Sequence, residues 1–189
     1  MTLGGIITRK QILARIQSDQ LISNAPPVSP NVISSGPSIC GYDLTLDTEF
    51  LSISTSSVTS DPKYAGSRVF GEMSRGKSFA IGPGEVLIAQ SVEVIKMPLD
   101  LVGIATQRSV YNNFGVVVNM PNLLPGYVGK ARFTITNFSK NGVILYPKEG
   151  ICSLMFHTVS LEDGEVGEAY TGKYNGMDEI SVLPPVNKS

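Results

Sequence analysis

A short polar run in the second half of the chain gathers groups that could hold an anion. It covers residues 107–115 and contains Arg108, Ser109, two asparagines and a closing glycine between two strand-like segments. A guanidinium offers two parallel donors, and the backbone N–H groups of a turn can align on a phosphate. The run therefore suggests a phosphate-binding loop, although an ordinary polar turn would have the same composition.

Other kinds of active site lack their required residues. His157 is the single histidine, and no Gly-x-Ser-x-Gly segment accompanies it, which argues against a Ser-His-Asp hydrolase. No Gly-x-x-x-x-Gly-Lys-Ser/Thr loop and no Gly-x-Gly-x-x-Gly turn after a strand occur. Zinc-dependent base deaminases need His-x-Glu and Pro-Cys-x-x-Cys segments. Neither segment is present, so we expect no zinc, and His157 is expected to be a structural strand residue.

Composition narrows the class of protein. The 189 residues carry a formal net charge of −1, which argues against a strongly basic nucleic-acid binder, and 42% are hydrophobic, enough for a folded core. No apolar run reaches the ~18 residues that a membrane span needs. The N-terminus, interrupted by Arg9 and Lys10, does not resemble a signal peptide. Cys40 and Cys152 lie far apart, so we expect a cytoplasmic protein with reduced thiols, a single disulfide being the alternative.

The elements that must position the polar run are mainly strands. Thr8 and Gln11 fit a capping box, which predicts a short N-terminal helix lying against a sheet. Residues 52–78 are expected to form a long Ser-, Thr- and Gly-rich excursion. Strand-like runs at spacings of about 8–12 residues indicate a sandwich or barrel, with Asn141-Gly142 as a hairpin turn. These runs cover residues 39–46, 79–81, 86–90, 92–96, 101–106, 115–120, 130–136, 142–146 and 151–159.

One of these runs predicts a ligand-facing surface. In residues 130–136, the period of two places Ala131, Phe133 and Ile135 on one face. The other face carries Arg132 and Thr134. The first face is apolar and should lie in the core, so the second should face water or a ligand.

Taken in order, several segments resemble the dCTP deaminase branch of the dUTPase superfamily. The likeness spans nearly the whole chain, and although each motif is modest, their order is specific. The matching segments are residues 7–12, the strand motif of residues 38–46, residues 79–90, residues 98–103, Arg108-Ser109, Pro125-Gly126-Tyr127-Val128-Gly129 with Asn137, residues 150–156, and Tyr170 with residues 173–176.

This resemblance implies an architecture and a ligand. It implies a distorted, jelly-roll-like β-barrel of the dUTPase type with a short N-terminal helix, in a homotrimer with nucleotide sites between subunits. Residues 1–163 would form the β domain, and residues 164–189 a tail that closes over the nucleotide. The ligand would be a pyrimidine deoxynucleoside triphosphate accompanied by Mg²⁺, which bridges phosphate oxygens.

The resemblance also assigns roles to single residues. It implies that Arg108 and Ser109 contact phosphates, that Tyr127 lies beside the deoxyribose, and that Tyr170 and Lys173 cover the triphosphate. Two further positions belong to the same expected nucleotide site. They are Arg132, which could add charge for a phosphate or fill part of the pocket, and Asn113, where the deaminases carry an arginine.

The departures from the family pattern concern chemistry. Thr134 occupies the position of the family's catalytic glutamate, and Leu124 that of an aspartate that orients sugar or water. Deamination without zinc needs a group that takes up and releases protons near neutral pH, which a carboxylate can do and a threonine hydroxyl cannot. The segment of residues 118–122 lacks the expected Thr-Ala, and Met177 replaces a usual glutamine.

Three interpretations remain open at this point. The first is a nucleotide-binding trimer with impaired deamination chemistry. The second is an active dCTP deaminase or dUTP diphosphatase in which other acids, such as Asp43, Glu85 or Glu149, reach the site. The third is a structural trimer with no nucleotide ligand.

Overall fold

The fold is mainly β, as the spacing of the strand-like runs predicts. The computed structural model describes residues 4–27, 30–53, 70–162, 165–172, 174–176 and 180, apart from the side chains of residues 70–72. Lys173 and most of the 52–78 excursion lie outside these residues. None of the helices in the described part of the chain has the length and apolarity needed to span a bilayer.

The N-terminal helix α1 (Arg9–Asp19) begins at the predicted capping box. The Thr8 N–H donates to Gln11 Oε1 at 2.9 Å, and Gln20 ends the helix in the left-handed conformation. The side chain of Ile12, a residue of this helix, is fully buried. Arg15 donates two hydrogen bonds to the Asp100 carboxylate, at 2.6 and 2.8 Å, and so ties α1 to the turn before β7.

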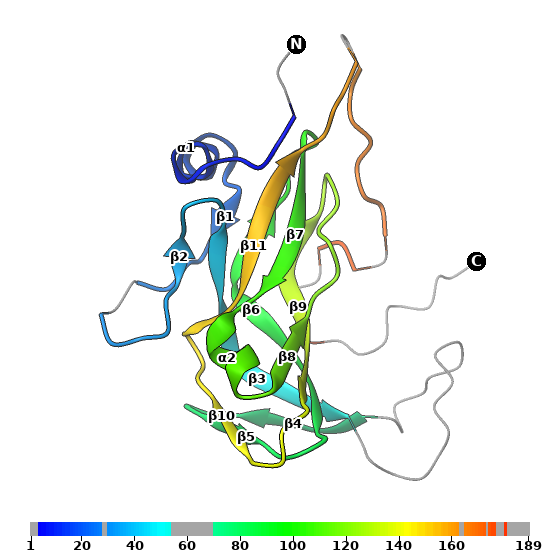
Figure 1. Cartoon of the computed structure of the whole chain (residues 1–189). Helices are drawn as coiled ribbons and strands as arrows, with labels where there is room; N and C mark the ends of the chain where they lie inside the picture. Colours follow the sequence, from blue (N-terminus) through cyan, green and yellow to red (C-terminus); the bar gives the residue numbers. More distant parts are fainter. Residues whose placement is uncertain are drawn as a thin grey trace, which may run out of the picture.

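A large sheet forms the body of the molecule. Its strands run in the order β7–β11–β3–β6–β9–β8, while β1, β2 and β4 pair at its margins and β5 pairs with β10 separately. Figure 1 shows α1 beside the upper ends of the long strands and the β5–β10 pair at the bottom of the molecule. The strands are β1 (Ile22–Ser23), β2 (Gly36–Pro37), β3 (Tyr42–Ile53), β4 (Phe70–Arg75), β5 (Phe79–Ile81), β6 (Val86–Lys96), β7 (Leu101–Gln107), β8 (Val116–Asn119), β9 (Val128–Asn137), β10 (Val143–Leu145) and β11 (Gly150–Thr158).

Strand β3 gives the sheet its barrel-like curvature. Its first half pairs with β11, and its second half pairs with β6 on the opposite edge. One strand thus links both halves of the sheet around a common core, in which Phe50, Phe133 and Phe156 are fully buried. The predicted mainly-β, barrel-like fold is confirmed.

Two predicted details differ from the structure. The runs at residues 86–90 and 92–96 form one strand, β6, whose register with β9 shifts between Gln90 and Val94. The hairpin predicted at Asn141-Gly142 is wrong, because β10 pairs with β5 and not with the preceding strand β9. The Asn137 amide explains this path, since it donates both to Ile81 O in β5 and to Asn141 O just before β10.

Strand β9 alternates as its sequence predicts. Ala131, Phe133 and Ile135 are fully buried, whereas Arg132 is half-buried and Thr134 is exposed. The polar run before β8 contains a short helix, α2 (Ser109–Asn113). The boundary between a β domain and a tail at residues 163–164 remains a prediction.

Candidate functional site

A cavity of about 480 Å³ lies on the polar face of β9. Strands β6 and β9 form its floor, the segment of residues 120–124 forms a wall, and two tail tyrosines complete it. The lining residues are Ile88, Gln90, Met120, Pro121, Asn122, Leu123, Leu124, Tyr127, Lys130, Arg132, Thr134, Tyr170 and Tyr174. The set combines aromatic and aliphatic surfaces with two cations, and none of these residues is a carboxylic acid.

The floor of the cavity is the alternating row Lys130, Arg132 and Thr134 of β9. Strand pairing sets Gln90 beside Arg132, and Ile88 beside Thr134. All three β9 side chains project from one face because successive strand residues point to opposite sides. The row predicted from the sequence therefore faces a cavity.

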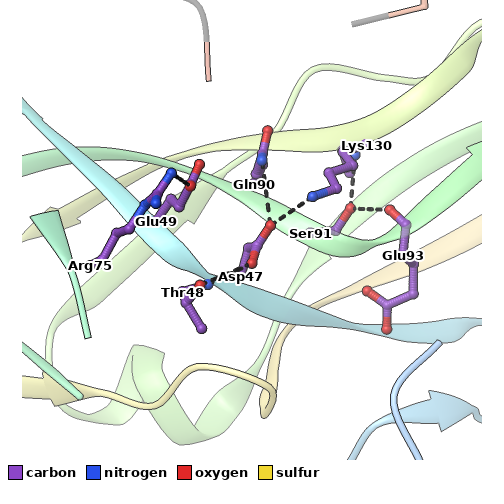
Figure 2. Close-up of polar contacts among 9 residues, drawn as sticks. Asp47, Thr48, Glu49, Arg75, Gln90, Ser91, Glu93 and Lys130 are labelled. Atoms are coloured by element: carbon purple, nitrogen blue, oxygen red, sulfur yellow. Dashed lines mark hydrogen bonds and ion pairs between the residues drawn. The ribbon is translucent and has the colours of Figure 1, made fainter. Parts of the chain in front are cut away.

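An acidic residue contacts two side chains of this floor. Asp47 of β3 accepts a hydrogen bond from Lys130 Nζ at 2.8 Å and a longer one from Gln90 Nε2 at 3.4 Å (Figure 2). Burial disfavours ionisation of Asp47, but the Lys130 bond and the Thr48 backbone N–H outweigh it and hold its pKa below the ordinary value. Asp47 is thus a paired carboxylate at neutral pH and a poor proton donor.

Arg132 stands opposite an aromatic ring of the tail. Its guanidinium carbon lies 5.4 Å from the centre of the Tyr174 ring, within the range of a cation–π contact. Burial lowers the pKa of the Arg132 guanidinium from its ordinary value, with the neighbouring tyrosines opposing that shift. A partly desolvated cation of this kind attracts anionic or acceptor-rich groups more strongly than a surface arginine does.

The tail closes the cavity by packing on the turn before β9. The Tyr170 N–H donates to Pro125 O at 2.7 Å, and the rings of Tyr127 and Tyr170 lie 6.1 Å apart. Gly126 adopts φ +78°, and a Cβ added there would meet Cα of Ala169 at 2.8 Å. A glycine is therefore needed for the tail to approach this turn.

The cavity brings together part of the predicted site. Tyr127, Arg132 and Tyr170 line it, together with Thr134 at the position predicted for the missing glutamate. Lys173 lies outside the described residues. The remaining predicted residues, Arg108, Ser109 and Asn113, are absent from the lining of this cavity.

Arg108 lies in a separate polar cluster. It forms an ion pair with Asp43 and donates a hydrogen bond to Ser34, and its side chain is 17% exposed. Its Nε is buried and has no hydrogen-bond partner among the described residues. The ion pair with Asp43 thus fixes the orientation of the Arg108 guanidinium.

Ser109 and Asn113 belong to the short helix beside Arg108. Ser109 is the first residue of α2 and is exposed, and Asn113 is its last residue. Asn113 lines a second, more open hollow together with Phe114, Gly115, Ser139, Asn141, Gly142 and Val143. Within one chain, Arg108, Ser109 and Asn113 are therefore separate from the aromatic cavity.

Sequence reasoning did not single out Glu93, a fully buried acid of β6. Its carboxylate accepts hydrogen bonds from the N–H and the Oγ1 of Thr45, each at about 3.0 Å. Burial raises the pKa of Glu93 to about 7, although the bonds from Thr45 favour the charged form. The Val-Glu-Val sequence predicts that the two valines face inward and the charge outward. Burial along β6 instead alternates through Leu87, Ala89, Ser91, Glu93 and Ile95, which places Glu93 on the buried face.

The described side chains do not form a cage for a metal ion. No group of three or more His, Cys, Asp or Glu residues within the described part of the chain is arranged to hold one. Mg²⁺ prefers few protein carboxylates together with phosphate oxygens and waters. The residues present would fit Mg²⁺ only as a companion of a bound phosphate.

Known proteins resemble this chain in both sequence and fold. A family model described as dCTP deaminase-like matches residues 6–159. The chain belongs to the dCTP deaminase-like family. A dCTP deaminase of Anaplasma phagocytophilum (strain HZ) is 31% identical over 152 residues, covering 80% of this chain and 82% of that protein. One of Nautilia profundicola is 32% identical over 165 residues, covering 85% and 86%.

Solved structures agree with the family assignment at the level of the fold. The crystal structure of 2'-deoxycytidine 5'-triphosphate deaminase from Agrobacterium tumefaciens aligns with a TM-score of 0.64 at 14% identity. The alignment covers 82% of this chain and 49% of that one, so this dCTP deaminase-like chain spans about half the length of the solved protein.

Proposed function

We propose that this member of the dCTP deaminase-like family binds a pyrimidine deoxynucleoside triphosphate as a homotrimer and has impaired deamination chemistry. The observation that carries this proposal is the composition of the 480 Å³ cavity. Aromatic and aliphatic walls suit a planar base, and Lys130 and Arg132 suit its acceptor groups or an anion. Thr134 supplies only a hydroxyl.

A trimer would complete the phosphate half of the proposed site. Arg108 and Ser109 do not line the cavity of their own chain, so in a trimer they would reach the phosphates of a nucleotide held mainly by a neighbour. The ion pair with Asp43 would orient the Arg108 guanidinium for this contact. Mg²⁺ would enter with the triphosphate and neutralise part of its charge.

The described residues that line the cavity include no acid, which supports impaired chemistry. The three acids considered from the sequence are engaged elsewhere: Asp43 with Arg108, Glu85 with the Gly82 N–H, and Glu149 with the Ile33 N–H. Asp47 contacts the cavity floor, but Lys130 keeps it ionised. Loss of a positioned proton-transfer group costs about 10²–10⁴-fold in rate.

Calorimetry and product assays test the proposal together. Titration with dCTP, dUTP and dTTP in the presence of Mg²⁺ should give saturable heat for at least one nucleotide, and Arg108→Ala should abolish it. Ser109→Ala, at an exposed position, serves as a second variant and should weaken binding without affecting folding.

Two outcomes would support the other interpretations. Heat for none of the three nucleotides would favour a structural trimer. Release of ammonia from dCTP, or of pyrophosphate from dUTP, at rates of about 1 s⁻¹ or more would favour an active enzyme.

A further inference from the structure

The tail forms a short turn where it contributes to the lining of the cavity. The Asn175 N–H donates to Gly172 O at 3.0 Å and closes this turn, which contains Tyr174. Tyr174 lines the cavity and faces the Arg132 guanidinium. Whatever fixes the turn therefore fixes the ring that covers the cationic part of the cavity.

The Asn175 side chain bonds both to the barrel and to the preceding part of the tail. Asn175 Oδ1 accepts a hydrogen bond from the Val128 N–H at 2.7 Å. Asn175 Nδ2 donates to Tyr170 O at 2.9 Å and, more weakly, to Gly126 O at 3.5 Å. Its amide thus bonds to the start of β9, to the turn before β9 and to the tail at once.

A backbone hydrogen bond adds a further contact between the tail and β9. The Gly176 N–H donates to Val128 O at 2.7 Å, so both backbone groups of Val128 bond to the tail. Gly176 has φ +77°, a conformation that glycine adopts without strain. Farther along, the Ile180 side chain is again buried, at 6% exposure.

We infer that Asn175 is a positioning residue that fixes the tail across the cavity and so sets Tyr174 opposite Arg132. The inference deepens the proposed function, because the residues it positions belong to the proposed nucleotide site. An asparagine suits this task because its amide carries both an acceptor and donors, whereas alanine has neither. Asn175 itself is exposed and outside the core, so its replacement should leave the barrel folded.

Amide hydrogen exchange, which needs no ligand, provides the first test. In Asn175→Ala, the Val128 and Gly176 amides should exchange about tenfold faster than in the unmodified chain, because a lost hydrogen bond is worth up to about that factor. Asn175→Asp keeps the acceptor for Val128 and loses the donor to Tyr170, so it should preserve most of the protection at Val128. Thr171→Ala, at an exposed position on the same segment, is the matched control and should leave both amides unchanged.

Nucleotide binding provides the second test, using whichever of dCTP, dUTP and dTTP binds the unmodified chain most tightly. Asn175→Ala should weaken binding about five- to tenfold through faster dissociation, with little change in thermal stability. Unchanged exchange at Val128 in Asn175→Ala would overturn the inference, and so would faster exchange with unchanged affinity. If no nucleotide binds, the proposed function fails, and the exchange result still decides whether Asn175 holds the tail.

Discussion

The Thr134 side chain can contact a ligand but cannot transfer a proton to it near neutral pH. It lies at the end of the cationic row of β9, exposed to the cavity. Its hydroxyl can donate and accept hydrogen bonds, but it does not exchange protons near neutral pH. A ligand could be held at this position without being transformed.

Restoring an acid at this position should restore some chemistry. Thr134→Glu should release ammonia from dCTP about 10²-fold faster than the unmodified chain, the lower end of what a proton-transfer group provides. The gain should stay small because Leu124 and Asn113 also depart from the family pattern. Ammonia release at stoichiometric protein concentration measures the effect.

Thr134→Gln is the matched control for this change. Glutamine has almost the shape of glutamate but cannot transfer a proton near neutral pH. Equal rates of ammonia release in the Glu and Gln variants would contradict the assignment of a missing acid at Thr134.

Glu93 makes the stability of the protein depend on pH. Its pKa is about 7 in the folded chain, against 4.5 for the ordinary group. Between these values the folded chain keeps the proton and the unfolded chain has released it, so the free energy of unfolding falls as pH rises. Glu93→Gln should remove this dependence, because an amide does not titrate.

Urea unfolding at pH 5 and pH 8 measures this effect. The unmodified chain should lose about 2–3 kcal/mol more than Glu93→Gln between these pH values. Parallel losses in the two proteins would show that Glu93 ionises normally within the fold.

At the scale of elements, the site depends on the contacts between the tail and the turn before β9. Strand β9 supplies the cationic row, and the turn before it supplies Tyr127. The tail joins them through Tyr170 N–H to Pro125 O and through Asn175. Close approach at Gly126 is what allows these segments to meet.

Gly126→Ala should loosen the contacts between the tail and the turn before β9. The new methyl group would meet Ala169 and also force alanine into a left-handed backbone conformation. Together these effects should cost about 1–3 kcal/mol of unfolding free energy and should weaken nucleotide binding. Urea unfolding and calorimetry provide the two measurements.

Gly84 is the matched control for Gly126. It has a similar φ of +74°, but no atom lies within 4 Å of the position of an added Cβ. Gly84→Ala should therefore show the backbone cost alone, and nucleotide binding should not change. If both alanine variants bound nucleotide as tightly as the unmodified chain, the tail contact at Gly126 would have no role in the site.

At the scale of the whole molecule, the proposed site would combine residues from more than one chain. The aromatic cavity and the Arg108 cluster have no lining residue in common. Phe114 and Phe138, near α2, are 63% and 72% exposed, and the Phe138 N–H donates to Gly115 O at 2.8 Å. Large apolar side chains so exposed are common at protein interfaces.

Mixed trimers should therefore recover binding that neither parent has. Arg108→Gln should disable the phosphate side of the site and Arg132→Gln the cavity side. After random reassembly of the two variants, about a quarter of the sites should combine intact halves from neighbouring chains and bind normally. Sedimentation should give a mass near 60 kDa, about three times the 20.2 kDa chain.

Two results would contradict this arrangement. A mass close to that of one chain would exclude the trimer. A trimer whose mixtures recover no binding would show that both halves of each site come from the same chain.

The amino-acid sequence by itself determined the features that depend on neighbouring residues. The capping box at Thr8 and the alternation along β9 are local patterns, and the structure confirms both. The order of the family motifs predicts the barrel-like fold for a similar reason, since most of the motifs are short stretches of neighbouring residues. Arg132 and Thr134 could thus be assigned to a face turned toward water or a ligand before any contact was known.

Only the tertiary structure decided which distant groups meet. Pairing of β10 with β5, burial of Glu93 against Thr45 and the bonds of Asn175 to Val128 all join residues about 50 or more positions apart. Local sequence carries little information on such contacts, because they depend on how the whole sheet curves. The curvature brings β9 and the tail together, and this junction encloses the cavity.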